Sequence, residues 1–184
     1  MTLQTRRLTY EQYLEGPEIK QRYDIVDGEM IFMAPAPTVN HQRILRRLVR
    51  IMDSFVTEGE LGEVLFAPVD VIVRRRPLRT RQPDLLFVSN EQIGILSQVV
   101  EGAPDLVVEI LSPGNSRGDI QDKLADYATI GVKECWLISP EARTVETLTL
   151  EEGNWHRASI RGVGDQIHSG VFEDLEVEVS QLFE

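Results

Sequence analysis

The sequence predicts an α/β fold, more closely an α+β arrangement in which a mixed β-sheet is flanked by helices. The chain has 184 residues and 42% hydrophobic content, which suits one domain with a real core, spanning residues 1–184. Several short strand-like segments follow one another and predict antiparallel neighbours. A helical segment separates two later apolar runs, which predicts one crossover between parallel strands.

Three helices are predicted from their start and stop signals and from apolar spacing. Thr9 with Gln12 three residues later forms a capping pair at the start of the first helix. In the second, His41 begins a stripe of mainly apolar residues at helical spacing. Gly131 is a typical residue for ending the third. The expected helices span residues 10–15, 38–57 and 117–130.

The strands are predicted from short apolar runs bounded by turn residues. Asp27-Gly28 is the pair typical of a two-residue hairpin turn, and Glu152-Gly153-Asn154 marks a second hairpin. The arginine-rich segment 74–81 is expected to be a basic loop, and segment 89–103 a loop with one helical turn. The expected strands span residues 23–26, 30–33, 63–67, 69–73, 84–88, 106–111, 134–138, 143–150 and 155–160.

The charge of the chain limits the ways in which it could bind nucleic acid. A formal net charge of −11 argues against binding through the whole surface. Nine arginines and five acids lie between Arg43 and Arg81, whereas acids dominate the last third. We therefore expect any contact with DNA to involve arginines of this middle segment. The same distribution is compatible with a solvated, salt-bridged surface.

Cysteine content and hydropathy indicate where the protein works. A single cysteine, Cys135, excludes an internal disulfide and fits a reducing environment. No apolar run reaches the length of a membrane span, and the first residues lack the apolar stretch of a secretory signal. We expect a cytoplasmic protein with no membrane partner.

Two acidic residues lie at the edges of buried apolar runs. Asp84 begins the run 84–88, and Glu109 lies near the end of the run 106–111. An ionised carboxylate inside an apolar run is costly to bury unless a cation or hydrogen bonds replace its water. Mg²⁺ or Mn²⁺ could be held by two such carboxylates, since a hard ion keeps several waters. Taken singly, each acid could equally cap a turn or pair with an arginine.

A lysine on the predicted third helix could complete this site. Alternation along the strand places Val107, Glu109 and Leu111 on one face, so the position two residues after Glu109 holds no cation. Lys123 could supply the cation from the helix, where it shares a face with Asp119 and Tyr127. The simpler alternative is a surface ion pair between Asp119 and Lys123.

Two further residues are candidates for supporting roles. His41 could act as a ligand or base that completes the site, or as a hydrogen-bonded histidine at the edge of the core. Asp70, in a strand context, is the better candidate for a third acidic ligand or for a partner of the ligands. No nucleophilic triad, phosphate-binding loop or zinc spacing is found.

Taken together, these stretches resemble the Uma-two family of restriction endonucleases, within the PD-(D/E)xK nuclease superfamily. The resemblance extends over nearly the whole chain, and it is the combination of short stretches that makes it specific. The matching stretches span residues 22–29, the helix of His41, and residues 67–71, 82–86, 103–113, 123–128, 131–138 and 172–183.

The resemblance implies a restriction-endonuclease-like core and an endonuclease that cleaves DNA with Mg²⁺. It implies Asp84 and Glu109 as metal-binding acids, the lysine moved to Lys123, and homodimers as a common state. Leu111 in the usual lysine position is the departure from the superfamily pattern. Two alternatives remain open: a catalytically inactive nuclease-fold module that binds DNA or a protein, and a metal hydrolase acting on a small phosphate ester.

Overall fold

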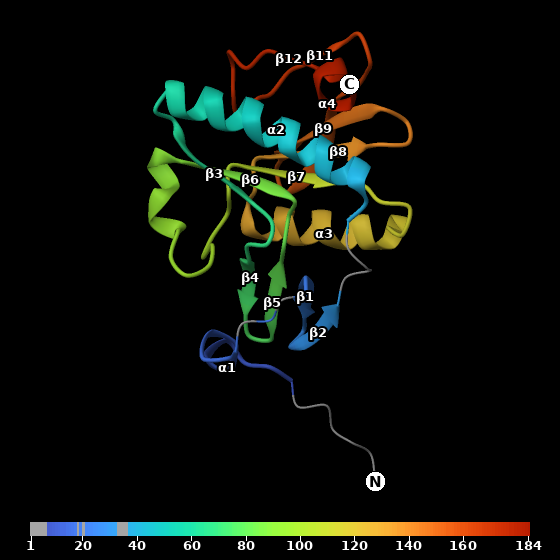
Figure 1. Ribbon diagram of the computed structural model, residues 1–184. Coiled ribbons are helices and arrows are strands. Elements are labelled where there is room, and N and C mark those ends of the chain that lie inside the picture. The colour runs from blue at the N-terminus through green and yellow to red at the C-terminus, as the bar shows by residue number, and fades with distance from the viewer. Residues whose placement is uncertain (1–6, 18, 20, 33–36) are drawn as a thin grey trace.

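A six-stranded sheet forms the centre of the molecule (Figure 1). The computed structural model describes residues 7–17, 19, 21–32 and 37–184. The strands are β3 (Gly62–Phe66), β6 (Leu85–Ser89), β7 (Leu106–Ile110), β8 (Glu134–Ser139), β9 (Thr144–Glu151) and β10 (Asn154–Gly162). Their order is β10-β9-β8-β7-β6-β3; β7 runs parallel to β8, and the other neighbours are antiparallel. The predicted mixed sheet is therefore confirmed.

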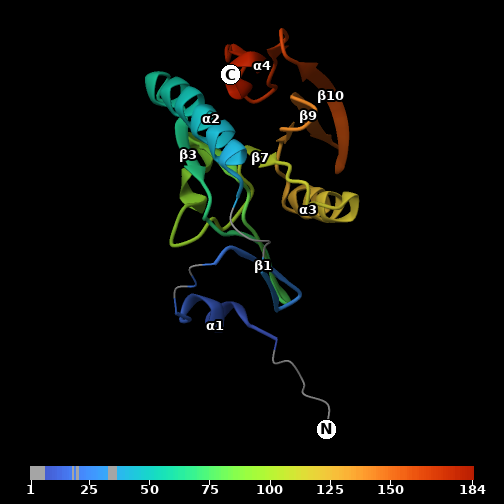
Figure 2. The same ribbon diagram turned by 45° about the vertical axis from the view of Figure 1, so that its right-hand side comes forward.

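Helices α2 (Val39–Glu58) and α3 (Arg117–Ile130) cover opposite faces of this sheet (Figures 1 and 2). The apolar stripe of α2 shares one core with Val108 of β7, and α3 shares a second core with Val107. Because side chains alternate along a strand, Glu109 points with Val107 toward α3. The crossover from β7 to β8 runs through α3, as the sequence predicted.

A second, four-stranded sheet lies beside the first, in the order β2-β1-β5-β4. It packs with α1 around a small apolar cluster that contains Tyr23, Ile25 and Leu78. Its elements are α1 (Tyr10–Leu14), β1 (Tyr23–Val26), β2 (Glu29–Phe32), β4 (Val71–Arg75) and β5 (Leu78–Arg81).

The prediction of a basic loop over residues 74–81 is wrong, because this segment forms most of the β4–β5 hairpin. Charge density alone suggested a solvated loop. In the structure the arginines are neutralised by acids of other segments: Arg74 pairs with Asp27, and Arg75 pairs with Glu101. Arginines can occupy neighbouring strand positions here because acidic partners balance their charge.

Local signals in the sequence agree closely with the ends of the helices and hairpins. Thr9 and Gln12 form the predicted capping box of α1, and Gly131 ends α3 in the left-handed conformation at φ 89°. Asp27 and Gly28 both have positive φ, as a tight hairpin turn requires. Met33, the last residue of a predicted strand, lies outside the described residues.

The segments without regular periodicity are less well predicted. The helical turn expected in 89–103 is the 3₁₀ helix η1 (Asn90–Ile95). The tail forms β11 (Gln166–Ile167), β12 (Val177–Glu178) and α4 (Val179–Phe183), where the sequence indicated only alternation. Over the described ranges, no helix combines the length and apolar character needed to cross a membrane.

Candidate active site at the junction of the two sheets

Asp84 lies directly before β6, where the chain passes from the second sheet into the central one. Its Oδ2 accepts a hydrogen bond from the backbone N–H of Ile110 at 2.8 Å and lies 3.2 Å from His41 Nε2. Its Oδ1 is 3.0 Å from Arg22 Nη1. Burial raises the pKa of this carboxyl, but His41, Arg22 and the Ile110 N–H outweigh burial and hold it below its usual range. Asp84 is therefore kept ionised.

Glu109, near the end of β7, is enclosed by two side chains of α3. Its Oε2 is 2.6 Å from Lys123 Nζ, and its Oε1 accepts a hydrogen bond from the Tyr127 hydroxyl at 2.6 Å. Burial raises the pKa of Glu109 above the usual glutamate value; Lys123 and Tyr127 oppose this rise, and the charge of Asp84 adds to it. Burial lowers the pKa of Lys123, but the charge of Glu109 outweighs it and raises that pKa.

Asp84 and Glu109 face one another across neighbouring strands. Leu85 of β6 is opposite Val108 of β7, so one further step along both strands brings Asp84 opposite Glu109. The two predicted acids thus lie side by side at the end of the central sheet where β6 begins and β7 ends.

Lys123 reaches this end of the sheet because α3 folds back over the end of β7. Leu111, two residues after Glu109, packs against the core on the α3 side of the sheet. Asp119 is occupied at the start of α3, where its Oδ2 accepts a hydrogen bond from Ser116 Oγ at 2.7 Å. The partner of Lys123 is therefore Glu109, 14 residues earlier in the chain.

His41 and Asp70, the two candidate supporting residues, are placed differently. His41 lies in the first turn of α2, is buried, and contacts Asp84 directly. Asp70 accepts hydrogen bonds from Tyr13 OH at 2.6 Å and from Gln82 Nε2 at 3.1 Å. Burial is the largest cause of the raised pKa of Asp70. The structure brings His41 to the pair of acids, whereas the described contacts of Asp70 include neither acid.

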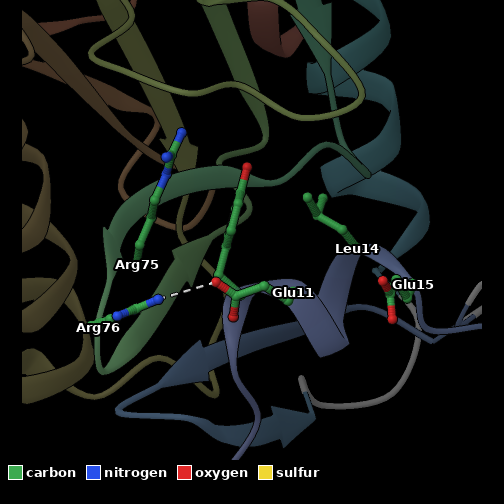
Figure 3. Close-up of a pocket in the computed structure, with 6 residues that line it drawn as sticks. Glu11, Leu14, Glu15, Arg75 and Arg76 are labelled. Atoms are coloured by element: carbon green, nitrogen blue, oxygen red, sulfur yellow. Dashed lines mark hydrogen bonds and ion pairs between the residues drawn. The ribbon is translucent and has the colours of Figure 1, made fainter.

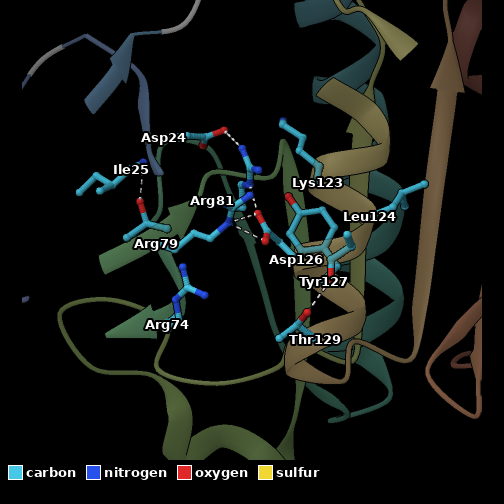
Figure 4. Close-up of polar contacts among 12 residues, drawn as sticks. Asp24, Ile25, Arg74, Arg79, Arg81, Lys123, Leu124, Asp126, Tyr127 and Thr129 are labelled. Atoms are coloured by element: carbon cyan, nitrogen blue, oxygen red, sulfur yellow. Dashed lines mark hydrogen bonds and ion pairs between the residues drawn. The ribbon is translucent and has the colours of Figure 1, made fainter. Parts of the chain in front are cut away.

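An ionic network joins the second sheet to α3 beside the site (Figure 4). Arg81 Nη1 is 2.8 Å from Asp24 Oδ2, and Arg81 Nε is 2.6 Å from Asp126 Oδ2. Arg79 Nε is 2.6 Å from Asp126 Oδ1. The charge of Asp24 also contributes to the raised pKa of Lys123, so Asp24 is part of the electrostatic surroundings of the site.

The sequence did not assign roles to three residues that the structure places in or beside the site. These are Arg22, Asp24 and Tyr127. A weak signal existed for two of them: Asp24 interrupts an apolar strand, and Tyr127 shares a helical face with Lys123. Arg22 had no local signal, because its contact with Asp84 spans 62 residues of sequence.

The donor atoms present fit an oxygen-liganded divalent ion. Within the part of the chain that the structure describes, no group of three or more His, Cys, Asp or Glu side chains forms a ready metal site. Two carboxylates suffice for Mg²⁺ or Mn²⁺, because these ions keep water ligands. The available atoms are Asp84 Oδ1 and Glu109 Oε2, which Arg22 and Lys123 neutralise here.

The cavity beside the pair of acids does not favour a small-molecule site there. One cavity of about 680 Å³ lies between α1 and the β4–β5 turn, away from the pair of acids, where Arg76 pairs with Glu11 (Figure 3). The cavity beside Glu109 and Lys123 has a volume of about 10 Å³, which is room for about one water. That volume does not enclose a small phosphate ester.

The fold matches that of a solved nuclease-like structure. It is described as "a putative nuclease belonging to DUF820" from Anabaena variabilis ATCC 29413. The TM-score is 0.76 over 96% of this chain and 97% of that chain, at 19% sequence identity. At this identity the similarity shows a shared α/β fold.

A family model identifies the group to which the sequence belongs. The model described as "Uma2: Putative restriction endonuclease" matches residues 9–180. This match covers most of the chain, so the protein belongs to the Uma2 family. The resemblance noted from the sequence is therefore confirmed. No curated protein matches the chain.

Proposed function

We propose that this protein is a divalent-metal-dependent endonuclease that hydrolyses phosphodiester bonds of DNA. The observation that carries the proposal is the pair of buried acids, Asp84 and Glu109, opposite one another on adjacent strands with Lys123 against Glu109. Membership of a family described as restriction endonucleases and the nuclease-like fold support the same activity.

Each side chain of the site has a distinct role in this proposal. Mg²⁺ or Mn²⁺, when bound, supplies polarisation of the phosphate and lowers the pKa of a bound water. Asp84 and Glu109 would hold the ion through carboxylate oxygens. The Lys123 ammonium offsets negative charge that develops on the phosphate. His41 fixes the orientation of Asp84 through its Nε2 contact.

A row of arginines on α2 is the surface that we propose for the DNA backbone. Arg43, Arg46 and Arg50 are exposed on the face of α2 that is opposite its buried stripe. Across the described ranges none of the three forms an ion pair, whereas the arginines of β4 and β5 are paired with acids. Unpaired arginines are free to neutralise phosphates without first breaking an existing pair.

A second candidate function is a nuclease-fold module without catalytic activity that binds DNA or a protein partner. This function is favoured because Arg22 and Lys123 already balance the charges of Asp84 and Glu109, so the two acids need no metal ion to be buried. The presence of Leu111 in the usual lysine position also favours a module without activity. A measurement of DNA cleavage distinguishes the endonuclease from the inactive module.

The direct test is incubation of the purified protein with supercoiled plasmid and with single-stranded DNA. Mg²⁺, Mn²⁺ and a chelator are compared, and Glu109→Gln and the exposed-residue variant Glu176→Gln are prepared in parallel. We expect cleavage by the wild type and by Glu176→Gln with metal, and none by Glu109→Gln. Cleavage that is equal in all three proteins would indicate a contaminating nuclease. DNA binding without cleavage would favour the module.

The family resemblance also leads us to propose a homodimer. Light scattering of the purified protein would then give twice the chain mass of 20.9 kDa. A mass of one chain at micromolar concentration would contradict this proposal.

A further inference from the structure

Arg22 holds the carboxylate oxygen of Asp84 that has no other side-chain partner among the described residues. Its Nη1 is 3.0 Å from Asp84 Oδ1, and its Nη2 donates a hydrogen bond to the carbonyl oxygen of Gln82 at 2.9 Å. The other oxygen, Oδ2, is held from inside by Ile110 and His41. Oδ1 is therefore the oxygen of Asp84 that can change its partner while the hydrogen bond from the Ile110 N–H to Oδ2 is kept.

Arg22 lies on the solvent side of this contact. Its side chain is 22% exposed, whereas that of Asp84 is 5% exposed. Its Nη2 bond to the Gln82 carbonyl can keep Arg22 beside the site when Nη1 leaves the carboxylate. Movement of Arg22 consequently requires no rearrangement of β6 or β7.

The charges at the site balance in a way that permits exchange. Two carboxylates, Asp84 and Glu109, are matched by two cations, Arg22 and Lys123. A divalent ion carries one more positive charge than the guanidinium that it replaces, while Lys123 stays at Glu109. Replacing Arg22 at Asp84 Oδ1 by such an ion keeps the carboxylate compensated, which is the condition for burying it.

We propose that Arg22 is a displaceable counter-ion of Asp84, which yields Oδ1 to the divalent ion and then binds the phosphate of the substrate. This inference rests on the proposed endonuclease function and adds a second phosphate-binding cation to Lys123. A guanidinium suits this role because its planar fork binds two phosphate oxygens at once. Arg22 thereby supplies a positive charge at a site where the strand position holds Leu111.

The test compares Arg22→Gln with the wild type in Mn²⁺ calorimetry and in DNA cleavage. Arg22→Gln removes the competing charge, so we expect Mn²⁺ to bind about tenfold more tightly. Cleavage by the same variant should fall roughly a hundredfold, because a phosphate contact is lost. Arg143→Gln is the matched control: it removes an arginine that pairs with Glu184 away from the site, and should change neither quantity.

Arg22→Lys keeps the charge and covers the case in which Arg22→Gln does not fold. A lysine cannot hold Asp84 and the Gln82 carbonyl with one planar group, so Mn²⁺ affinity should rise and cleavage should fall, both less than in Arg22→Gln. Equal or weaker Mn²⁺ binding in the folded variants would make Arg22 a permanent structural partner and overturn the inference. If the wild type cleaves no DNA, the endonuclease proposal and the phosphate-binding role of Arg22 are both wrong. If Arg22→Gln nevertheless binds Mn²⁺ more tightly, the displacement of Arg22 by the ion is still supported.

Discussion

The Nζ atom of Lys123 lies 2.6 Å from Oε2 of Glu109, an ion pair that joins α3 to the end of β7. The helix that carries Lys123 is also the crossover between two parallel strands, so the fold itself returns this lysine to the acid. A cation can therefore reach the site from a helix although Leu111 occupies the strand position.

Replacing Lys123 by alanine should lower the rate of DNA cleavage by roughly two to three orders of magnitude, the usual effect of losing one contact that stabilises the transition state. Metal affinity should change little or rise. The variant should also be less stable, by about 3–5 kcal/mol, because Glu109 loses its buried partner. Urea unfolding and single-turnover cleavage measure the two effects.

Lys133→Ala is the matched control for this experiment. Lys133 pairs with Asp105 at 2.6 Å and has a side chain that is 57% exposed, outside the candidate site. Its removal should leave the cleavage rate unchanged. If Lys123→Ala cleaves at the wild-type rate, Lys123 has no role in the chemistry.

Asp84→Asn should abolish binding of divalent ions while the fold is retained. The amide has nearly the same shape, and its oxygen can still accept the hydrogen bond of the Ile110 N–H, but it carries no charge to attract an ion. Calorimetry with Mg²⁺ and Mn²⁺ measures the binding, and circular dichroism checks the fold. Unchanged binding in a folded variant would remove Asp84 from the metal site.

The pH dependence of stability should reveal Asp105, a buried carboxylate outside the candidate site. Burial raises its pKa, but hydrogen bonds from Lys133 and the Ser89 N–H outweigh burial and lower it. An acid with a lowered pKa stabilises the folded state above its unfolded pKa of about 3.9 and loses this contribution as the pH falls through the folded value.

Asp105→Asn should therefore be less stable than the wild type at pH 6, and the difference should shrink toward pH 2. Midpoints of urea unfolding across this range measure it. A difference that is constant with pH would show that the Asp105 charge does not contribute.

Neutralising the α2 row, Arg43, Arg46 and Arg50, should weaken DNA binding and flatten its dependence on salt. Each lost phosphate contact should reduce the log–log slope by about 0.9. The triple variant of Arg74, Arg75 and Arg76 serves as the comparison, since those side chains are paired with acids. A larger loss of slope in the β4–β5 variant would move the DNA surface to that hairpin.

Features encoded within a few residues could be predicted from the sequence. The capping box at Thr9, the hairpin turn at Asp27-Gly28 and the end of α3 at Gly131 all depend on local backbone chemistry. The placement of Asp84 and Glu109 at the ends of strands followed from apolar patterning. Their alignment depends on the pairing of β6 with β7, which the sequence only suggested.

Features that depend on distant charges could not be predicted. The β4–β5 hairpin looked like a loop because the acid that neutralises Arg74 is 47 residues away. Arg22 was missed for the same reason. Asp70 looked similar to Asp84 in sequence, but its hydrogen bonds with Tyr13 and Gln82 depend on how the second sheet packs.

The division of the site between two sheets has a consequence for its motions. Glu109 and Lys123 belong to the central sheet and its helix, whereas Arg22 directly precedes β1, which joins β5 through the pair Ile25–Thr80. A shift of the guanidinium from Asp84 therefore involves the residue before β1 and leaves β6 and β7 paired. Hydrogen exchange should then be faster in β1 than in β7, because β1 belongs to the smaller sheet and β7 to the central one.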